Sequence, residues 1–323
     1  MDDAAAVAPP SRWRRLAGLL RGRNIVRGLV AILVLLVLYY GIGGYLYMRV
    51  DDDPAFTPPA PIEGGSRVVD MAAALIEREV NQHAWQPNDP LFMPNGMVIH
   101  AAAFQAGIQG AWARMAIEFE DQLGRIRGSS RVDPDLERAR GLLNFPPNVW
   151  YFDFSKSLLP TITSEQNYRA GRQALLAYNQ RLAAKGAVFD IRTDSLAATL
   201  DRVVNDLGAQ SAAIDDHLRD QSGWLINFDA DRLFYHVKGR LYAYQMMLRE
   251  LGRDFEPVIR QNNLDGVWSQ VLDTMREAGE LRPFIVADAS PRGSIFANHL
   301  AIQGFYLKRM LVQLKEMSQV LVN

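Results

Sequence analysis

The sequence predicts an all-α protein, in which one N-terminal transmembrane helix is followed by a large, mostly antiparallel helical bundle. Two observations support this prediction: a long apolar stretch near the N-terminus, and apolar residues that recur every three or four positions in several later segments. Such spacing places the apolar side chains on one face of each helix, as in antiparallel bundles. The alternating pattern of a half-buried strand is almost absent.

Residues 28–48 form the apolar stretch, which has twenty-one residues without a charge between Arg27 and Arg49. A helix of ~20 apolar residues, rising ~1.5 Å per residue, crosses a hydrocarbon core of ~30 Å. Four tyrosines lie in its C-terminal half, where an aromatic belt meets lipid headgroups. A cleaved signal peptide is the alternative, but it has a shorter apolar region and ends in small residues, whereas this stretch ends in Tyr-Leu-Tyr-Met-Arg.

Charge and cysteine content limit the orientation and the chemistry. Residues 1–27 form a basic segment with six arginines, and three aspartates (51–53) follow the apolar stretch, so the positive-inside rule predicts a cytoplasmic N-terminus. Residues 1–50 carry a net charge of +5, and the whole chain carries −1, so residues 51–323 carry about −6. Because nucleic-acid binding requires a basic surface, we do not expect this exported part to bind nucleic acid. The chain has no cysteine, which excludes thiol catalysis and iron–sulfur ligation.

The first half of the exported part begins with a linker. Residues 49–66 contain four prolines and predict a semi-stiff spacer that holds the folded domain, residues 67–323, away from the bilayer. Ser66 can cap a helix that starts near Arg67. A proline-punctuated loop (85–95) precedes a long helix over residues 97–126.

The second half continues the helical pattern. Asp133-Pro134 predicts the start of a short helix that ends near Leu143, and Ser164 can cap the next helix. Residues 187–191 read as extended chain. Apolar residues at helical spacing then predict four further helices, at 194–221, 229–251, 264–280 and 296–321.

Polar residues interrupt two of the predicted apolar stripes. His217 follows Gln210 by seven residues on one helix, and Gln303 lies one turn after His299 on the last helix. One interpretation is a buried polar layer that sets the register of the bundle. The other is a polar cavity between helices, where bundles hold ligands.

No catalytic, cofactor-binding or metal-ligating residue is predicted. None of the five histidines belongs to a Glu-x-x-His or His-Glu-x-x-His pattern, and the Glu79/His83 pair reads as exposed. A metal site assembled from separate helices remains an alternative. The sequence also lacks a glycine-rich phosphate loop and a nucleophile elbow, so it does not predict an enzyme.

An aromatic run over residues 150–154 has three interpretations: core at the end of the bundle, a patch that binds a partner, or contact with the membrane surface. Contact with the membrane surface is the least favoured of the three, because the predicted spacer holds the domain away from the bilayer. The residues of this candidate interaction patch are Trp150, Tyr151, Phe152 and Phe154.

Four blocks carry a resemblance to a known family: MVIHAAAFQAG, NFPPNVWYFDFSKSLLPTITSE, GWLINFDADRLFYHVKGRLYAYQMMLRELG and DTMREAGELRPFIV. They resemble an uncharacterised family of bacterial inner-membrane proteins with one N-terminal anchor and an exported helical domain of unknown function. The resemblance implies a periplasmic domain and supplies no catalytic residues. We therefore expect a periplasmic domain that binds or scaffolds another envelope component, with an envelope protein as the expected partner. A periplasmic enzyme or a lipid- or ligand-binding domain with a polar cavity is the alternative.

Overall fold

Helices account for all the regular structure in the described part of the chain, so the all-α prediction is confirmed. The structure is a computed structural model that describes residues 22–47, 50–90, 92–94, 99–125, 132–152, 159–220, 228–281 and 299–322. Most of the basic N-terminal segment, residues 1–21, and Phe154 of the aromatic run lie outside the described residues.

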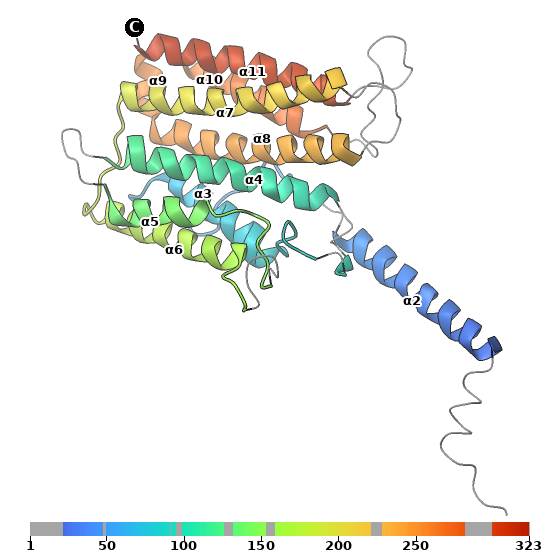
Figure 1. The fold of residues 1–323 in the computed structure, drawn as a ribbon. Helices are drawn as coiled ribbons and strands as arrows, with labels where there is room; N and C mark the ends of the chain where they lie inside the picture. Colours follow the sequence, from blue (N-terminus) through green and yellow to red (C-terminus); the bar gives the residue numbers. More distant parts are fainter. Residues whose placement is uncertain are drawn as a thin grey trace, which may run out of the picture.

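The first described helix, α2 (Gly22–Tyr47), projects away from the other helices (Figure 1). Its stretch Asn24–Tyr45 is 22 residues long, has a mean hydropathy of 2.4, and is long and apolar enough to cross a membrane. Its large apolar side chains, from Ile25 to Tyr45, are exposed. By length and composition, α2 is suited to be a membrane anchor or a signal sequence.

The remaining helices form a layered domain. In Figure 1, α7 and α11 lie on one side, α8 and α4 in the middle, and α5 and α6 on the other side. The bounds are α3 Arg67–Glu77, π-helix η1 Arg78–Gln82, α4 Ile99–Glu118, π-helix η3 Phe119–Leu123, α5 Pro134–Leu143, α6 Ser164–Ala183, α7 Thr193–Asp220, α8 Phe228–Asp254, α9 Glu256–Gln261, α10 Asp265–Gly279 and α11 His299–Val322.

The central pair, α4 and α8, runs parallel, unlike the antiparallel pairs α7–α11 and α5–α6 (Figure 1). Their backbones touch at two glycines. A Cβ at Gly107 would overlap the carbonyl of His236, and a Cβ at Gly239 would overlap the carbonyl of Phe104. Only glycine permits such an approach, so these residues close the seam between the two helices.

Helix starts agree closely with the capping residues in the sequence. Ser66 caps α3, and Asp133 caps α5 with Pro134 in its first turn, as predicted. The prediction for α6 was one residue late, because Thr163 is the cap and forms a capping box with Gln166. The long helix predicted over 97–126 is split in the structure, since α4 passes into η3 at Phe119. No strand forms at 187–191.

The residues that follow α2 do not form a free spacer, so that prediction is wrong for residues 50–56, which we call the docked segment. The carbonyl of Asp53 accepts a hydrogen bond from the Tyr242 hydroxyl at 2.8 Å. Arg249 donates to the carbonyls of Pro54 and Phe56. Pro54 and Ala55 form a turn in which the Phe56 amide donates to the carbonyl of Asp53. Side chains of α8 satisfy further backbone acceptors of the segment.

Candidate functional site

The four polar residues predicted for a cavity lie on the α7–α11 pair. The ion pair between Asp215 and Lys308 (2.8 Å) and the hydrogen bond from Ser318 to Asp201 (2.6 Å) set an antiparallel register. This register brings His217 level with Gln303, and it places Gln210 about two turns away.

Of these four, Gln303 is completely buried, and its amide donates to the carbonyl of Phe234 at 3.1 Å. Burial lowers the pKa of His299. Gln210 and His217 are partly buried. None of the four lines the cavity described next, which lies on a different helix pair.

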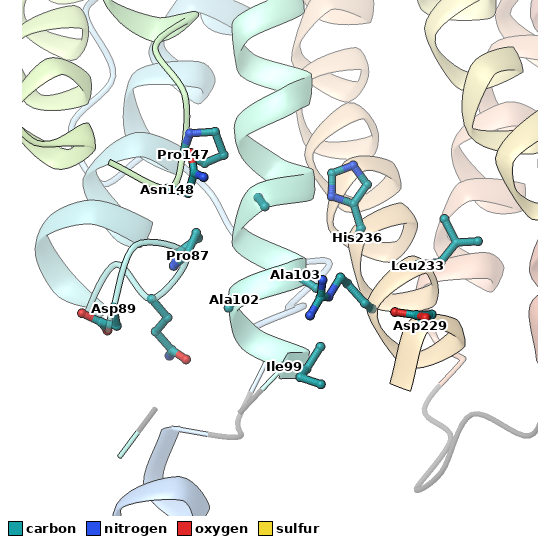
Figure 2. Close-up of a pocket in the computed structure, with 13 residues that line it drawn as sticks. Pro87, Asp89, Ile99, Ala102, Ala103, Pro147, Asn148, Asp229, Leu233 and His236 are labelled. Atoms are coloured by element: carbon teal, nitrogen blue, oxygen red, sulfur yellow. The ribbon is translucent and has the colours of Figure 1, made fainter. Parts of the chain in front are cut away.

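A cavity of about 720 Å³ lies between α4 and α8, at the end of the domain nearest α2 (Figure 2). The seam is closed at Gly107 and Gly239. Towards the first turns of both helices, the small side chains of Ala102, Ala103 and Ala106 leave the space open. The two helices start at the same end because they run parallel, so their first turns form two walls of this cavity.

Polar side chains enter the cavity from α8. His236 projects from α8 on the side that faces α4, with Asp229 about two turns earlier on the same helix (Figure 2). Arg232, one turn before His236, also lines the cavity. Burial, with a smaller effect of the nearby Arg240 guanidinium, lowers the pKa of His236 to about 4. His236 is therefore a neutral imidazole at pH 7, able to donate one hydrogen bond and accept another.

Two loops close the cavity on the side opposite α8. The first contributes Gln86, Pro87 and Asp89, and the second contributes Pro147 and Asn148. Hydrogen bonds join the loops: the Trp85 indole donates to the carbonyl of Pro147 at 3.0 Å, and the Asn88 amide donates to the carbonyl of Val149 at 2.9 Å. These bonds hold the cavity wall in one shape.

Ion pairs also attach the docked segment to the domain, through residues that do not line the cavity. Asp52 pairs with Lys238 of α8 at 2.8 Å, and both side chains are almost completely buried. Asp51 lies 3.6 Å from His83 and 3.8 Å from Arg78. We call these five residues the ionic clasp.

The clasp continues into a hydrogen-bonded cluster. Arg78 donates to Glu79 at 2.8 Å and to the Tyr242 hydroxyl at 2.7 Å, and its guanidinium stacks over the ring of Phe56 at 4.6 Å. Burial raises the pKa of Glu79, but His83 and Arg78 lower it more, so the carboxyl stays below its usual range and ionised. The Glu79 contact raises the pKa of His83.

The expectation of an exposed Glu79/His83 pair is therefore wrong for Glu79, which is buried, while His83 is about half-buried. Glu79 lies within the π-helical turn η1, and its carboxylate contacts Arg78 and His83. Among the described residues, no group of three or more acidic or histidine side chains is arranged to hold a metal ion.

The core interpretation of the aromatic run is wrong for Tyr151 and Phe152, whose side chains are exposed. Trp150 packs edge-on against Phe92, with ring centroids 5.8 Å apart. Phe92 belongs to the short stretch 92–94, which lies against α2: Tyr39 donates to its carbonyl at 3.3 Å. The run is therefore next to α2.

Sequence reasoning missed the clasp, although two features pointed to it. Lys238 is four residues after Phe234 and three before Leu241, so the helical period places its charge on the buried face of α8. A charge on that face requires a partner. Asp51 and Asp52 follow the apolar stretch and so indicate membrane topology, but their ion-pair partners are distant in sequence.

Comparisons with known proteins agree with the resemblance seen in the sequence blocks. No curated protein and no solved structure matches the chain. The matched family is described as an uncharacterized protein conserved in bacteria, and its domain has no known function. The match includes α4 to α7 and the loops that line one side of the cavity. Residues 84–222 of this chain thus match the bacterial family DUF2333.

Proposed function

We propose that the chain is a single-pass protein of the bacterial inner membrane, with a cytoplasmic N-terminus and a periplasmic helical domain that binds another component of the cell envelope. The docked segment supports this proposal most strongly, because the buried ion pair between Asp52 and Lys238 ties the domain to the residues that follow α2. A domain held in this way meets its partner at the membrane surface rather than at the end of a long tether.

A topology experiment tests the first part. We expect full-length protein with alkaline phosphatase fused after residue 323 to stay in the membrane fraction at its unprocessed mass, with the phosphatase active. Alkaline phosphatase becomes active only after export, so an inactive fusion protein would contradict a periplasmic location of the helical domain. A soluble product shortened by the length of the N-terminal segment would show that α2 is a signal sequence.

The outer face of α11 is our candidate for the partner contact. Phe305, Val312 and Val320 are exposed on it, at spacings of seven and eight residues that keep them on one side of the helix. Exposed apolar side chains aligned in this way are typical of an interaction surface. We expect an envelope protein to co-purify with the full-length chain in constant ratio from mild detergent.

The matched variants are Phe305→Ser with Val312→Ser, and Lys315→Ser as a control on the exposed side of the same helix. The double variant should lose the partner, and the control should keep it. If no protein co-purifies with the wild-type chain, or if both variants retain it equally, binding through this face is refuted.

The cavity between α4 and α8 favours a second candidate, binding of a small ligand or a lipid headgroup. Its volume, about 720 Å³, is within the range of ligand sites (roughly 300–1,000 Å³), and it combines alanine side chains with a neutral imidazole. Native mass spectrometry of protein purified from its own membranes should then show a bound small molecule. Ala106→Trp, which fills the cavity, should abolish that mass, whereas Ala213→Trp on the exposed face of α7 should not.

A further inference from the structure

An exposed apolar cluster surrounds the aromatic run at the α2 end of the domain, and we call it the aromatic foot. Three stretches of the chain contribute to it, and its members and exposed fractions are Phe92 (59%), Tyr151 (45%), Phe152 (43%), Leu159 (72%) and Ile162 (65%), with Trp150 partly buried between them. A monomeric soluble domain rarely leaves so many large apolar side chains together in water.

Hydrogen bonds give the foot a defined shape. Thr161 donates from its backbone to the carbonyl of Tyr151 and from its hydroxyl to the carbonyl of Trp150, both at 2.9 Å. The Trp150 ring contacts the rings of Phe92 and Phe152, with centroids 5.8 Å apart in each case. The exposed side chains therefore stand on a braced backbone.

The foot lies beside the apolar helix, not beyond its end. The stretch 92–94 runs along α2: Pro94 lies so close to Gly43 that a Cβ there would overlap it, and Tyr39 donates to the carbonyl of Phe92. Tyr39 precedes Tyr45, the last residue of the apolar stretch, by six residues, or ~9 Å along a helix. Phe92 is thus level with the span itself.

Composition also fits a lipid environment. Among the described residues of 92–94, 149–152 and 159–163, none carries a charge. Tryptophan and tyrosine are enriched where the hydrocarbon core meets the headgroups, since their rings are apolar and their N–H and O–H groups are polar. Protein partners usually meet a surface that also includes charged residues at its rim.

We propose that the aromatic foot is immersed in the outer leaflet of the membrane that α2 spans, and that it contacts lipid rather than a protein. This inference rests on the proposed function, in which α2 is an uncleaved anchor. The foot and the ionic clasp then attach the domain at two points, and this fixes which side of it faces the bilayer.

The absence of cysteine makes a direct depth measurement possible. Full-length single-cysteine variants, labelled with the environment-sensitive fluorophore NBD, are reconstituted into vesicles of phosphatidylethanolamine and phosphatidylglycerol. The foot is probed with Phe92→Cys, Tyr151→Cys and Leu159→Cys. Leu36→Cys probes α2, and Val320→Cys, near the end of α11 far from α2, is the aqueous control (Figure 1).

We expect the three foot labels to show blue-shifted emission and several-fold stronger quenching by lipids with a nitroxide near the headgroup than the label at position 320. Quenching of the label at position 36 without quenching of the three foot labels would overturn the proposal, while α2 would still be a membrane anchor. The same result is expected if the foot binds a protein partner in the cell instead of lipid. No quenching at 36 would show that α2 itself is not in the bilayer.

A charged variant provides a second readout. Leu159→Asp combined with Ile162→Asp introduces two carboxylates at exposed positions, so it should leave the helical circular dichroism unchanged. It should reduce the quenching of the Phe92→Cys label, because charges are costly to place among acyl chains. Unchanged quenching at position 92 would refute immersion of this part of the foot.

Discussion

Charged groups are buried both in the ionic clasp and at Glu118, but their hydrogen bonding differs. In the clasp, Lys238 pairs with Asp52 and donates to the carbonyl of Leu281 at 2.8 Å. Glu118, at the end of α4, lies 3.9 Å from Arg114 and is also influenced by the charge of Arg202, but neither of its carboxylate oxygens accepts a hydrogen bond from the described residues.

The pKa of Glu118 shows the consequence. Burial raises it to about 7, although Arg202 and Arg114 act in the opposite direction. The pKa of the buried Glu79 beside the clasp is instead lowered, because the side chains of His83 and Arg78 are in contact with it. Direct contacts, more than the degree of burial, thus decide whether a buried carboxylate stays charged.

Removal of the clasp lysine should have the largest effect. Lys238→Met leaves Asp52 buried without its cation, which typically costs roughly 3–5 kcal/mol of unfolding free energy, and we expect the lower end because Asp52 can reach water if the docked segment detaches. Urea unfolding of the full-length protein in detergent measures the loss. Lys308→Met, which breaks the exposed pair with Asp215, is the control and should cost less than about 1 kcal/mol.

Hydrogen exchange locates the effect of the same variant. The amides of residues 50–56 should exchange faster in Lys238→Met, while those of α10 remain protected. Equal losses of stability in the two lysine variants would mean that the buried pair does not hold the segment.

Neutralising Glu118 should produce a smaller effect of the opposite sign. Its folded pKa of about 7 exceeds the usual 4.5, so its contribution to stability is fully present below pH 4.5 and is lost as the pH rises through 7. Glu118→Gln should therefore stabilise the protein at pH 8, by up to about 3 kcal/mol, and change little at pH 4.5.

Denaturant midpoints at the two pH values test this, with Glu316→Gln on the exposed face of α11 as the control. A destabilised Glu118→Gln protein at pH 8 would show that the arginines compensate the charge more fully than the distances suggest.

The smallest effect concerns His83, which faces Glu79, Asp51 and the cationic Arg78. Since its pKa is raised in the folded state, its contribution is fully present below the usual value of 6.5 and is lost as the pH rises through the folded value. The docked segment should thus be held more tightly at pH 5.5 than at pH 8, by less than about 1 kcal/mol because His83 is partly exposed.

Hydrogen exchange of residues 50–56, corrected for the intrinsic pH dependence of the rate, should show this difference in the wild type. His83→Gln should remove it, and amides in α10 serve as the internal reference. A pH difference that persists in His83→Gln would assign the titration to another group.

Local sequence patterns were sufficient for the helices. Ser66 and the Asp133-Pro134 pair mark helix starts through hydrogen bonds within one turn, and the apolar periods place Leu200, Leu241 and Leu307 in the core. The candidate site was less predictable. His236 lies on the predicted α8 helix, but only the parallel pairing of α4 and α8 opens a cavity beside it.

By itself, therefore, the sequence determined the all-α class, the apolar span and most helix boundaries, because these depend on interactions between residues a few positions apart. The tertiary structure decided which charges are paired and where the linker and the aromatic run lie. Asp52 and Lys238 are 186 positions apart, and Tyr39 and Phe92 are 53 apart. Contacts over such separations form only when the helices pack, and no local pattern encodes them.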